Sequence, residues 1–267
     1  MDKTFDELRV MLKANYPLLY FATTEYDRVK QKIRRIAFDL DYSFNSWDTV
    51  EGLSSHTKKQ TGKYVEVDKH KLHSNTKTAE ALLGEIKALI EGELKEEADT
   101  NKIPSKEIYF IEDFHKYFKE EKVLVYLRKL TSLLKGSNKH LILVSPFFKL
   151  PDELEKYVTI VNVPLPDRDD LQIRLNDVKD KEEVNPDLEK FLIDAALGMT
   201  DMEADLAFRL AKVKDGLNSK EAIRTISNEK EQIIKKSGIL DYYQVNEKKK
   251  KSVGGLDILK KYLTLRS

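Results

Sequence analysis

The sequence predicts an α/β protein with a Rossmann-like three-layer core, a mostly parallel sheet and a small all-α domain after it. Three observations predict this fold. Short apolar runs alternate with amphipathic helical patterns up to residue 166. Polar residues that could do chemistry follow several of these runs directly. After Pro166 the strand signals stop, and helical patterns continue as far as Lys236.

The first part of the core begins with a helix, because Phe5, Leu8 and Leu12 recur at helical spacing before Tyr16-Pro17 interrupts the pattern. The predicted elements are a helix over residues 2–13, a strand over 18–22, a helix over 29–40, a strand over 42–50 and a weak strand over 64–67. The polar stretches 53–63 and 68–77 are predicted to be loops and candidate contact surfaces.

The rest of the core continues the alternation of strands and helices. The predicted elements are a helix over residues 82–94, a loop over 99–106, a strand over 108–111, a helix over 123–134, and strands over 141–144 and 158–161. In the helical region, Asn185-Pro186 and Thr200 each precede an acidic first turn and are predicted to begin helices. We predict an α/β domain over residues 1–166, a helical lid-like domain over 167–237, and a lysine-rich linker leading into a further segment over 238–267.

Composition excludes several classes of function. The 267 residues carry 47 Lys+Arg and 46 Asp+Glu, so a formal charge of +1 gives no general attraction to nucleic acid or an anionic membrane. The absence of cysteine excludes disulfides, thiol nucleophiles and Cys-ligated metals. Charged residues follow Met1, and no apolar run approaches the length of a membrane span. We therefore expect a cytoplasmic protein with neither nucleic acid nor membrane as a partner.

A phosphate-binding loop is not found. The pattern G-x-x-x-x-G-K-[ST] supplies backbone N–H groups, a lysine and a hydroxyl for phosphate and magnesium. Gly62-Lys63 is the one Gly-Lys pair, and it has Thr57 and Tyr64 where the pattern requires Gly and Ser/Thr. The loop over residues 23–28 contains no glycine and two carboxylates, which would repel phosphate.

Glu112-Asp113, directly after the predicted strand 108–111, is the best candidate for chemistry. Paired carboxylates at this place hold magnesium and orient the attacking water in ATPases. His115 could join a metal site. The structural alternative is that the two acids cap a helix beginning near Phe114.

Other candidate groups carry weaker signals. His70-x-x-His73 has metal-binding spacing on a helix, but its polar, basic surroundings indicate an ordinary exposed segment. His56 and His140 have no evident partner, and no serine stands in a nucleophile-elbow context.

Three stretches together resemble the AAA family of ATPases. Residues 158–175 contain the Pro-x-Pro-Asp sequence of that family's last strand, residues 187–206 resemble its lid, and residues 108–113 resemble its Walker B strand. More narrowly, residues 16–28, 112–115, 145–155 and 229–240 resemble the group typified by the hypothetical chloroplast reading frame AAA proteins of plastids and bacteria.

The resemblance covers nearly the whole chain and implies the amino-terminal, degenerate AAA-like half of a longer protein. Residues 253–263 resemble the opening of a second, catalytic AAA module, and the sequence ends at Ser267. The chain is then expected to be either a piece of a longer protein or the product of a gene that encodes the front half alone.

Departures from the family pattern bear on function. The phosphate loop is lost, and the acidic pair is in the reverse order of the family's. Ser145 stands where active modules place a sensor asparagine, and no arginine finger occurs between Lys149 and Thr159. Phosphoryl transfer depends on positioning and charge stabilisation, so the resemblance implies a pseudo-ATPase. Glu112 and Asp113 are then a vestigial Walker B-like pair, Ser145 is sensor-like, and no catalytic, cofactor-binding or metal-binding residue is expected.

The resemblance also implies a non-catalytic role in assembly, regulation or substrate recruitment for a catalytic AAA module, in cis or in trans. A protein substrate or a second copy of the chain is a further expected partner. ATP and magnesium would bind only through the second module or at a weak, unconventional site. Two alternatives stay open: residual nucleotide binding or metal-dependent hydrolysis through Glu112, Asp113 and His115, and a free-standing protein-interaction adaptor.

Overall fold

A computed structural model describes residues 3–61, 64–71, 76–100, 105–135, 137–180 and 182–236. The described residues form two compact units, one made by residues 3–174 with 197–205 and the other by residues 175–196 with 206–236. The predicted domain boundary at residue 166 stays a prediction. The predicted linker over 238–267, with the segment 253–263 that resembles a further module, lies outside the described residues.

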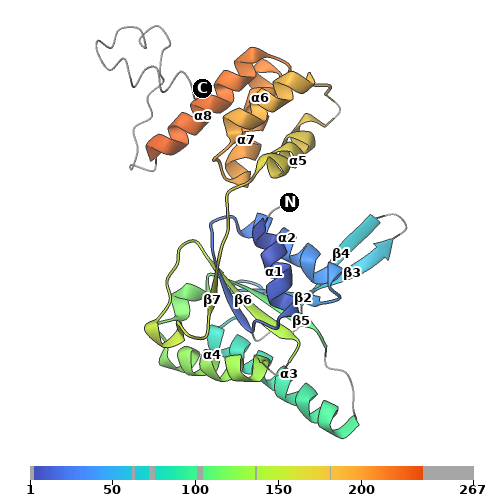
Figure 1. Cartoon of the computed structure of the whole chain (residues 1–267), viewed down its shortest axis with the longest axis vertical. Coiled ribbons are helices and arrows are strands. Elements are labelled where there is room, and N and C mark those ends of the chain that lie inside the picture. Colours follow the sequence, from blue (N-terminus) through green and yellow to red (C-terminus); the bar gives the residue numbers. More distant parts are fainter. Residues whose placement is uncertain are drawn as a thin grey trace, which may run out of the picture. The chain divides into compact units, whose positions relative to one another are not determined.

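The first unit is built on a seven-stranded sheet with the strand order β4-β3-β2-β5-β6-β1-β7 (Figure 1). Its strands are β1 (Leu18–Ala22), β2 (Ser43–Asp48), β3 (Gly52–Thr61), β4 (Tyr64–Lys71), β5 (Glu107–Glu112), β6 (Lys139–Ser145) and β7 (Thr159–Asn162). The pairs β2–β5, β5–β6, β6–β1 and β1–β7 are parallel, and β2–β3 and β3–β4 are antiparallel. The predicted mostly parallel α/β sheet is confirmed.

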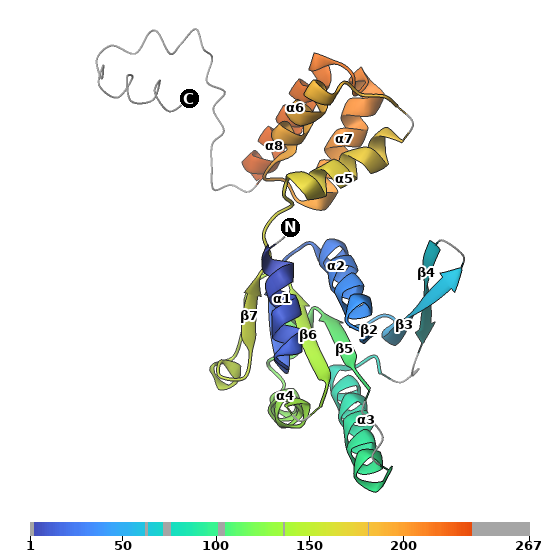
Figure 2. The same ribbon diagram turned by 45° about the vertical axis from the view of Figure 1, so that its right-hand side comes forward.

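Helices cover both faces of this sheet (Figure 2). The helices of this part are α1 (Lys3–Lys13), α2 (Tyr26–Asp39), α3 (Ala79–Thr100), the 3₁₀ turn η1 (Phe114–Tyr117), α4 (Glu121–Leu134) and the 3₁₀ turn η2 (Asp152–Leu154). One apolar cluster joins α1 and α2 to the sheet, and a second joins α3 and α4 to it. The three-layer prediction is therefore confirmed.

Strand β1 shows why the apolar runs identify the strands. Leu18 and Tyr20 belong to the cluster with α3 and α4, whereas Leu19 and Phe21 belong to the cluster with α1 and α2. A parallel strand buried on both faces is apolar at every position, so it appears in the sequence as a continuous apolar run. The predicted bounds of β1 match the structure, and those of β5, β6 and β7 differ by at most two residues.

The loop predictions were wrong for residues 53–61 and 68–71, because these residues belong to β3 and β4, which form an antiparallel hairpin. A tight turn joins β2 to β3, and in it Asp48 Oδ1 accepts hydrogen bonds from the amides of Val50 and Glu51, both at 2.8 Å. Gly52 then takes a φ of +78°, which suits glycine. The backbone of β3 pairs with β2 and β4 although its sequence is polar. Polar strands of this kind lack the apolar signal on which the prediction relied.

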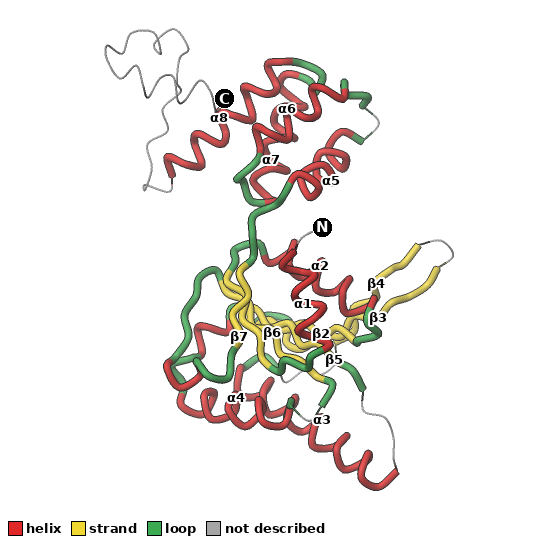
Figure 3. Tube along the Cα trace, viewed as in Figure 1, coloured by secondary structure: helices red, strands yellow, loops and turns green. Residues whose placement is uncertain are grey.

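The region after β7 is helical, as predicted, and no further strand occurs in the described part of it (Figure 3). Its helices are α5 (Arg168–Lys179), α6 (Pro186–Ala196), α7 (Asp201–Asp215) and α8 (Lys220–Lys236). Both predicted helix starts are confirmed. Asn185 Oδ1 accepts the amide of Asp187 at 2.9 Å, and Thr200 and Glu203 form a reciprocal capping box.

Candidate functional site

The carboxyl ends of β1, β5 and β6 lie side by side because these strands are parallel neighbours. This brings the loop after β1, the pair Glu112-Asp113 and Ser145 to one edge of the sheet. Two backbone hydrogen bonds join the segments there: the amide of Asp113 donates to Val144 O at 2.8 Å, and the amide of Thr23 donates to Ser145 O at 2.7 Å. The sequence-predicted site residues are therefore neighbours in space.

The loop after β1 is held by an ion pair. Arg28 contacts the Glu25 carboxylate at 2.7 Å and Asp170 Oδ2 at 2.9 Å, and it also donates to Pro164 O. The second oxygen of Glu25 accepts the backbone amide of Asp201 at 2.6 Å. Both residues are buried, with 9% of Glu25 and 7% of Arg28 exposed. A negative side chain of the protein thus lies in the loop where a nucleotide-binding member of the fold would cradle phosphate.

The two acids after β5 are also engaged by the protein's own side chains. Glu112 Oε1 lies 2.8 Å from Lys30 Nζ. One oxygen of Asp113 accepts a hydrogen bond from Tyr26 Oη, and the other pairs with Lys116. The expected cap is not formed, since Asp113 precedes η1 but its carboxylate makes no capping bond.

The pKa values of this pair follow from their surroundings. Burial opposes ionisation of Asp113, but hydrogen bonds from Lys116 and Tyr26 outweigh it and place the pKa of this carboxyl below its ordinary value. Burial, followed by the hydrogen bond to Asp113, raises the pKa of Tyr26 well above that of a free tyrosine. Tyr26 is therefore a fixed donor to a carboxylate that stays charged at neutral pH.

Ser145 and His115 form the remaining part of this edge. Both are buried, and Ser145 Oγ and His115 Nδ1 have no hydrogen-bond partner among the described residues. The His115 ring packs edge-on against Phe147, with ring centroids 4.9 Å apart, and burial lowers its pKa. His115 is neutral at pH 7 in this environment.

These residues do not fit a magnesium-bound nucleotide. Magnesium and phosphate need uncommitted carboxylates, cations and N–H donors. Here Glu112 pairs with Lys30, and Glu25 pairs with Arg28. Asp113 pairs with Lys116 and accepts a hydrogen bond from Tyr26. No group of three or more His, Asp or Glu side chains suited to a metal occurs in the part of the chain that the structure describes.

Two histidines without an evident partner in the sequence have partners in the structure. His56 Nε2 lies 2.7 Å from Ser46 Oγ, and His140 contacts Tyr16 O at 2.7 Å and Tyr42 Oη at 3.2 Å. Burial, with a smaller contribution from Lys30 and Arg34, lowers the pKa of His56 to about 4. His70 lies in strand β4 and not on a helix, and His73 is outside the described residues.

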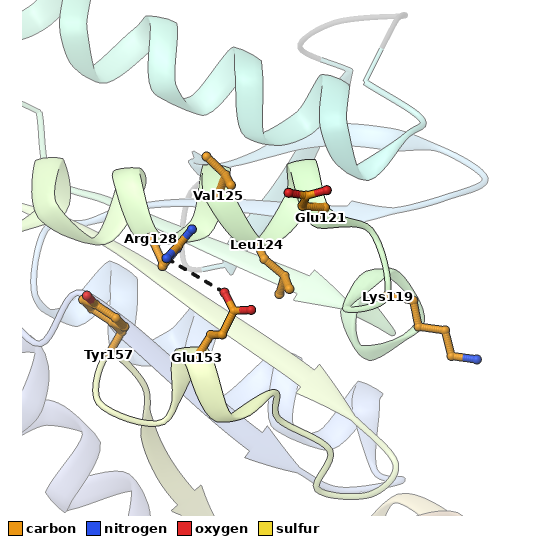
Figure 4. A pocket seen from close by; sticks show the side chains of 7 residues that line it. All are labelled: Lys119, Glu121, Leu124, Val125, Arg128, Glu153 and Tyr157. Atoms are coloured by element: carbon orange, nitrogen blue, oxygen red, sulfur yellow. Dashed lines mark ion pairs between the residues drawn. The ribbon is translucent and has the colours of Figure 1, made fainter.

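A groove of about 610 Å³ between α4 and η2 was not predicted from the sequence (Figure 4). It is lined by Lys119, Glu121, Leu124, Val125, Arg128, Glu153 and Tyr157. Arg128 and Glu153 lie opposite each other, 3.9 Å apart, and the groove shares no residue with the carboxyl edge of the sheet. Its lining comes from two segments about 30 residues apart, which helical periodicity alone does not bring together.

None of the described helices combines the length and apolarity that crossing a membrane requires. The fold is similar to that of two solved structures. C. elegans PCH-2 gives a TM-score of 0.50 at 11% identity, over 87% of this chain and 68% of that one. A chain of the E. coli MS115-1 HORMA:CdnC:Trip13 complex gives a TM-score of 0.53 at 10% identity, over 91% of this chain and 89% of that one. These likenesses concern the fold alone.

Sequence relatives extend the similarity over nearly the whole chain. Uncharacterized AAA domain-containing proteins named ycf46 are 27% identical in Trieres chinensis and 24% identical in Pyropia yezoensis, each over 98% of this chain. The chain spans about half the length of these relatives, 48% and 49%. Residues 4–163 match the N-terminal domain of SpoVK-like AAA ATPases, and residues 169–237 match the second domain of the same family. The chain therefore belongs to the SpoVK-like AAA ATPase family.

Proposed function

We propose that this chain is a non-catalytic, pseudo-ATPase region that serves assembly, regulation or substrate recruitment for a catalytic AAA module, in cis or in trans. One observation carries the proposal. Three acids at the carboxyl edge of the sheet are opposite a cation or donor of the same chain: Glu25 with Arg28, Glu112 with Lys30, and Asp113 with Lys116 and Tyr26. These carboxylates have their charge and hydrogen-bond partners within the chain and need no ligand to supply them.

The chemistry of phosphoryl transfer supports this view. Its catalysis rests on positioning and on charge stabilisation of the transferred group. The loop over residues 23–28 has no glycine, and its buried carboxylate would have to leave Arg28 and the Asp201 amide before phosphate could approach. Moving a buried charge away from its partners costs several kcal/mol, on the order of the affinity of a weak ligand.

The role beside a catalytic module rests on length and family. The chain spans about half of the relatives it matches, and its two matched domains are named as the N-terminal and second domains of the family. A region of this kind would act by contact with the remaining part of such a protein.

Phosphate release from Mg·ATP tests the proposal. We expect the purified chain to release phosphate no faster than a Glu112→Gln variant, because Glu112 is paired with Lys30 and activates no water. Magnesium-dependent turnover that Glu112→Gln abolishes would overturn the proposal.

A residual nucleotide- or metal-binding site is the second candidate. Ser145 Oγ and His115 Nδ1, which have no partner among the described residues, lie at the same edge as Asp113 and favour it. Turnover or binding that is lost in a Ser145→Ala or His115→Phe variant would select this alternative.

A further inference from the structure

The outer part of the β3–β4 hairpin is a two-stranded ribbon that projects from the rest of the sheet (Figure 2). Strand β2 pairs with β3 only from Gly52 to His56, whereas β4 pairs with β3 as far as Thr61. Residues 57–61 of β3 therefore pair with β4 alone, and at about 3.4 Å per residue they extend for about 17 Å. The inner half of β3 is held in the sheet, and the ribbon extends outward from it.

The register of the hairpin divides its charged residues between two faces. Successive residues of a strand lie on opposite faces, and residues directly opposite each other in the ladder share a face. Lys58, Lys69 and Lys71 therefore share the face of His56. None of the described hairpin positions on this face, here named the lysine face, is acidic. Lys58 and Lys69 are diagonal neighbours in the ladder, so their like charges oppose the pairing of the two strands.

The opposite face of the hairpin has the reverse balance of charge. Its described positions hold one lysine, Lys59, and two acids, Glu66 and Asp68. Lys59 lies directly opposite Glu66 in the ladder, so this lysine has an acid as its cross-strand neighbour. The three lysines of the lysine face have no such neighbour among the described hairpin positions. A face on which like charges gather in this way is complementary to an anionic partner.

The lysine face is on the side of the sheet that α2 covers. His56 lies opposite Phe44 of β2, with the two ring centroids 5.4 Å apart, and Phe44 belongs to the apolar cluster with α1 and α2. Burial lowers the pKa of His56 most, and the positive charges of Lys30 and Arg34 lower it further. Lys30 pairs with Glu112. Arg34 therefore extends the basic region from the hairpin onto α2.

We propose that the lysine face of the β3–β4 hairpin binds duplex DNA, with the ribbon in the major groove and the basic residues at the phosphates beside it. The major groove of B-form DNA, about 12 Å wide, admits a two-stranded ribbon, whereas the corresponding groove of duplex RNA is too narrow. The duplex carries one negative charge per about 1.7 Å of its axis, so a ribbon about 17 Å long runs beside several phosphates. Contacts to phosphate carry no sequence information, and binding without sequence preference is expected.

This inference goes beyond the proposed function and does not depend on whether the carboxyl edge of the sheet binds a nucleotide. It also revises the expectation that nucleic acid is not a partner. That expectation rests on the formal charge of +1, which averages the lysine face with the rest of the chain. The potential that a partner meets is set by the local arrangement of charge.

The expected affinity is modest and depends on salt. Lys58, Lys69, Lys71 and Arg34 allow up to about four phosphate contacts, and each contributes about −0.9 to the slope of log affinity against log salt concentration. We therefore expect a slope of about −3 to −4 and a dissociation constant of about 1 to 100 μM at physiological salt.

Fluorescence anisotropy of a labelled DNA duplex of about 20 base pairs and mixed sequence, titrated with the whole chain at about 50 to 200 mM NaCl, tests the surface. The Lys58→Gln/Lys69→Gln/Lys71→Gln variant should lose at least about tenfold in affinity, and the magnitude of its salt slope should fall by about 3. The matched control removes the same charge from exposed positions in and beside α4 and should bind within about twofold of the wild type: Lys119→Gln/Lys122→Gln/Lys129→Gln. A wild type that does not bind up to about 300 μM, or a hairpin variant that binds like the wild type, would overturn the proposal.

Two further comparisons test the face and the partner. Lys58→Gln should weaken binding and lower the magnitude of the salt slope by about 1, whereas Lys59→Gln, one residue along the strand on the opposite face, should change the affinity by less than about twofold. Equal losses in the two variants would contradict the assigned face. A poly-glutamate peptide of about 20 residues should compete with the duplex at least about tenfold more weakly than unlabelled duplex does. Equal competition would overturn DNA as the partner and would indicate a surface for acidic polypeptides.

Discussion

The two ends of the sheet both carry ion-pair clusters, but they differ in what they are expected to do. At the amino ends of β5 and β6, Lys139 is only 1% exposed and lies 2.8 Å from Glu93 and 3.2 Å from Glu107. It also donates to Ser105 Oγ at 2.6 Å, and Tyr109 donates to Glu107. This cluster joins α3 to two strands and stands in no position tied to family chemistry.

At the carboxyl ends, the cluster of Glu25, Arg28, Lys30, Glu112 and Asp113 lies at the edge of the sheet where the resemblance to AAA ATPases implies a nucleotide site. Its members nonetheless pair with one another as those at the amino end do. Acids at the expected position therefore do not by themselves define a binding site. The side chains that pair with these acids decide whether a ligand can bind to them.

The largest effect is expected at the amino end. Lys139→Met leaves Glu93 and Glu107 without their cation and should lower the free energy of unfolding by about 3 kcal/mol in urea denaturation. Lys129→Met, at an exposed position of α4, is the matched control and should change it by less than about 0.5 kcal/mol. Equal effects of the two substitutions would contradict a structural role for the buried cluster.

At the carboxyl end, Arg28→Met should lower the free energy of unfolding by about 2 kcal/mol, because it removes charge-assisted hydrogen bonds to Glu25 and Asp170. Arg35→Met, an exposed change on the same helix, serves as the control. An Arg28→Met variant as stable as the wild type would mean that the ion pair does not hold this loop. It would contradict the view that the two clusters stabilise the fold in the same way.

Lys30→Met should have a smaller effect, about 0.5 kcal/mol, because the side chains of Lys30 and Glu112 remain 21% and 24% exposed and solvent screens the pair. Chemical denaturation of Lys30→Met, Glu112→Gln and the double variant would measure the coupling between the two residues. A coupling energy near zero would mean that Glu112 and Lys30 do not stabilise each other, and Glu112 would then not belong to the cluster.

The smallest effect concerns pH. Glu93 and Asp113 both have a lowered pKa, since hydrogen bonds to their charged forms outweigh the effect of burial. Their contribution to stability is therefore present above the unfolded-state pKa of about 4 and is lost as the pH falls through the lower folded-state pKa. The stability difference between wild type and Glu93→Gln, or wild type and Asp113→Asn, should shrink from pH 7 to pH 3. A stability difference that grows as the pH falls would contradict the lowered pKa values assigned to Glu93 and Asp113.

Much of the fold was predictable because β1, β5, β6 and β7 are apolar runs between turn residues, and because parallel strands place their carboxyl ends together. The structure shows that the same parallel arrangement places Glu112, Asp113 and Ser145 at one edge. The partners of the acids were not predictable, since Lys30 and Tyr26 lie more than 80 residues before them and meet them only through the packing of α2. The β3–β4 hairpin was missed because polar paired strands give no apolar period.

Isothermal titration of the chain with Mg·ATP and Mg·ADP, repeated with Glu112→Ala/Asp113→Ala, tests the central claim most directly. If the acids of the carboxyl-edge cluster are fully paired within the chain, no binding heat should be measured up to millimolar nucleotide for either protein. Micromolar binding that the double substitution abolishes would contradict the claim and identify Glu112 and Asp113 as part of a working nucleotide site.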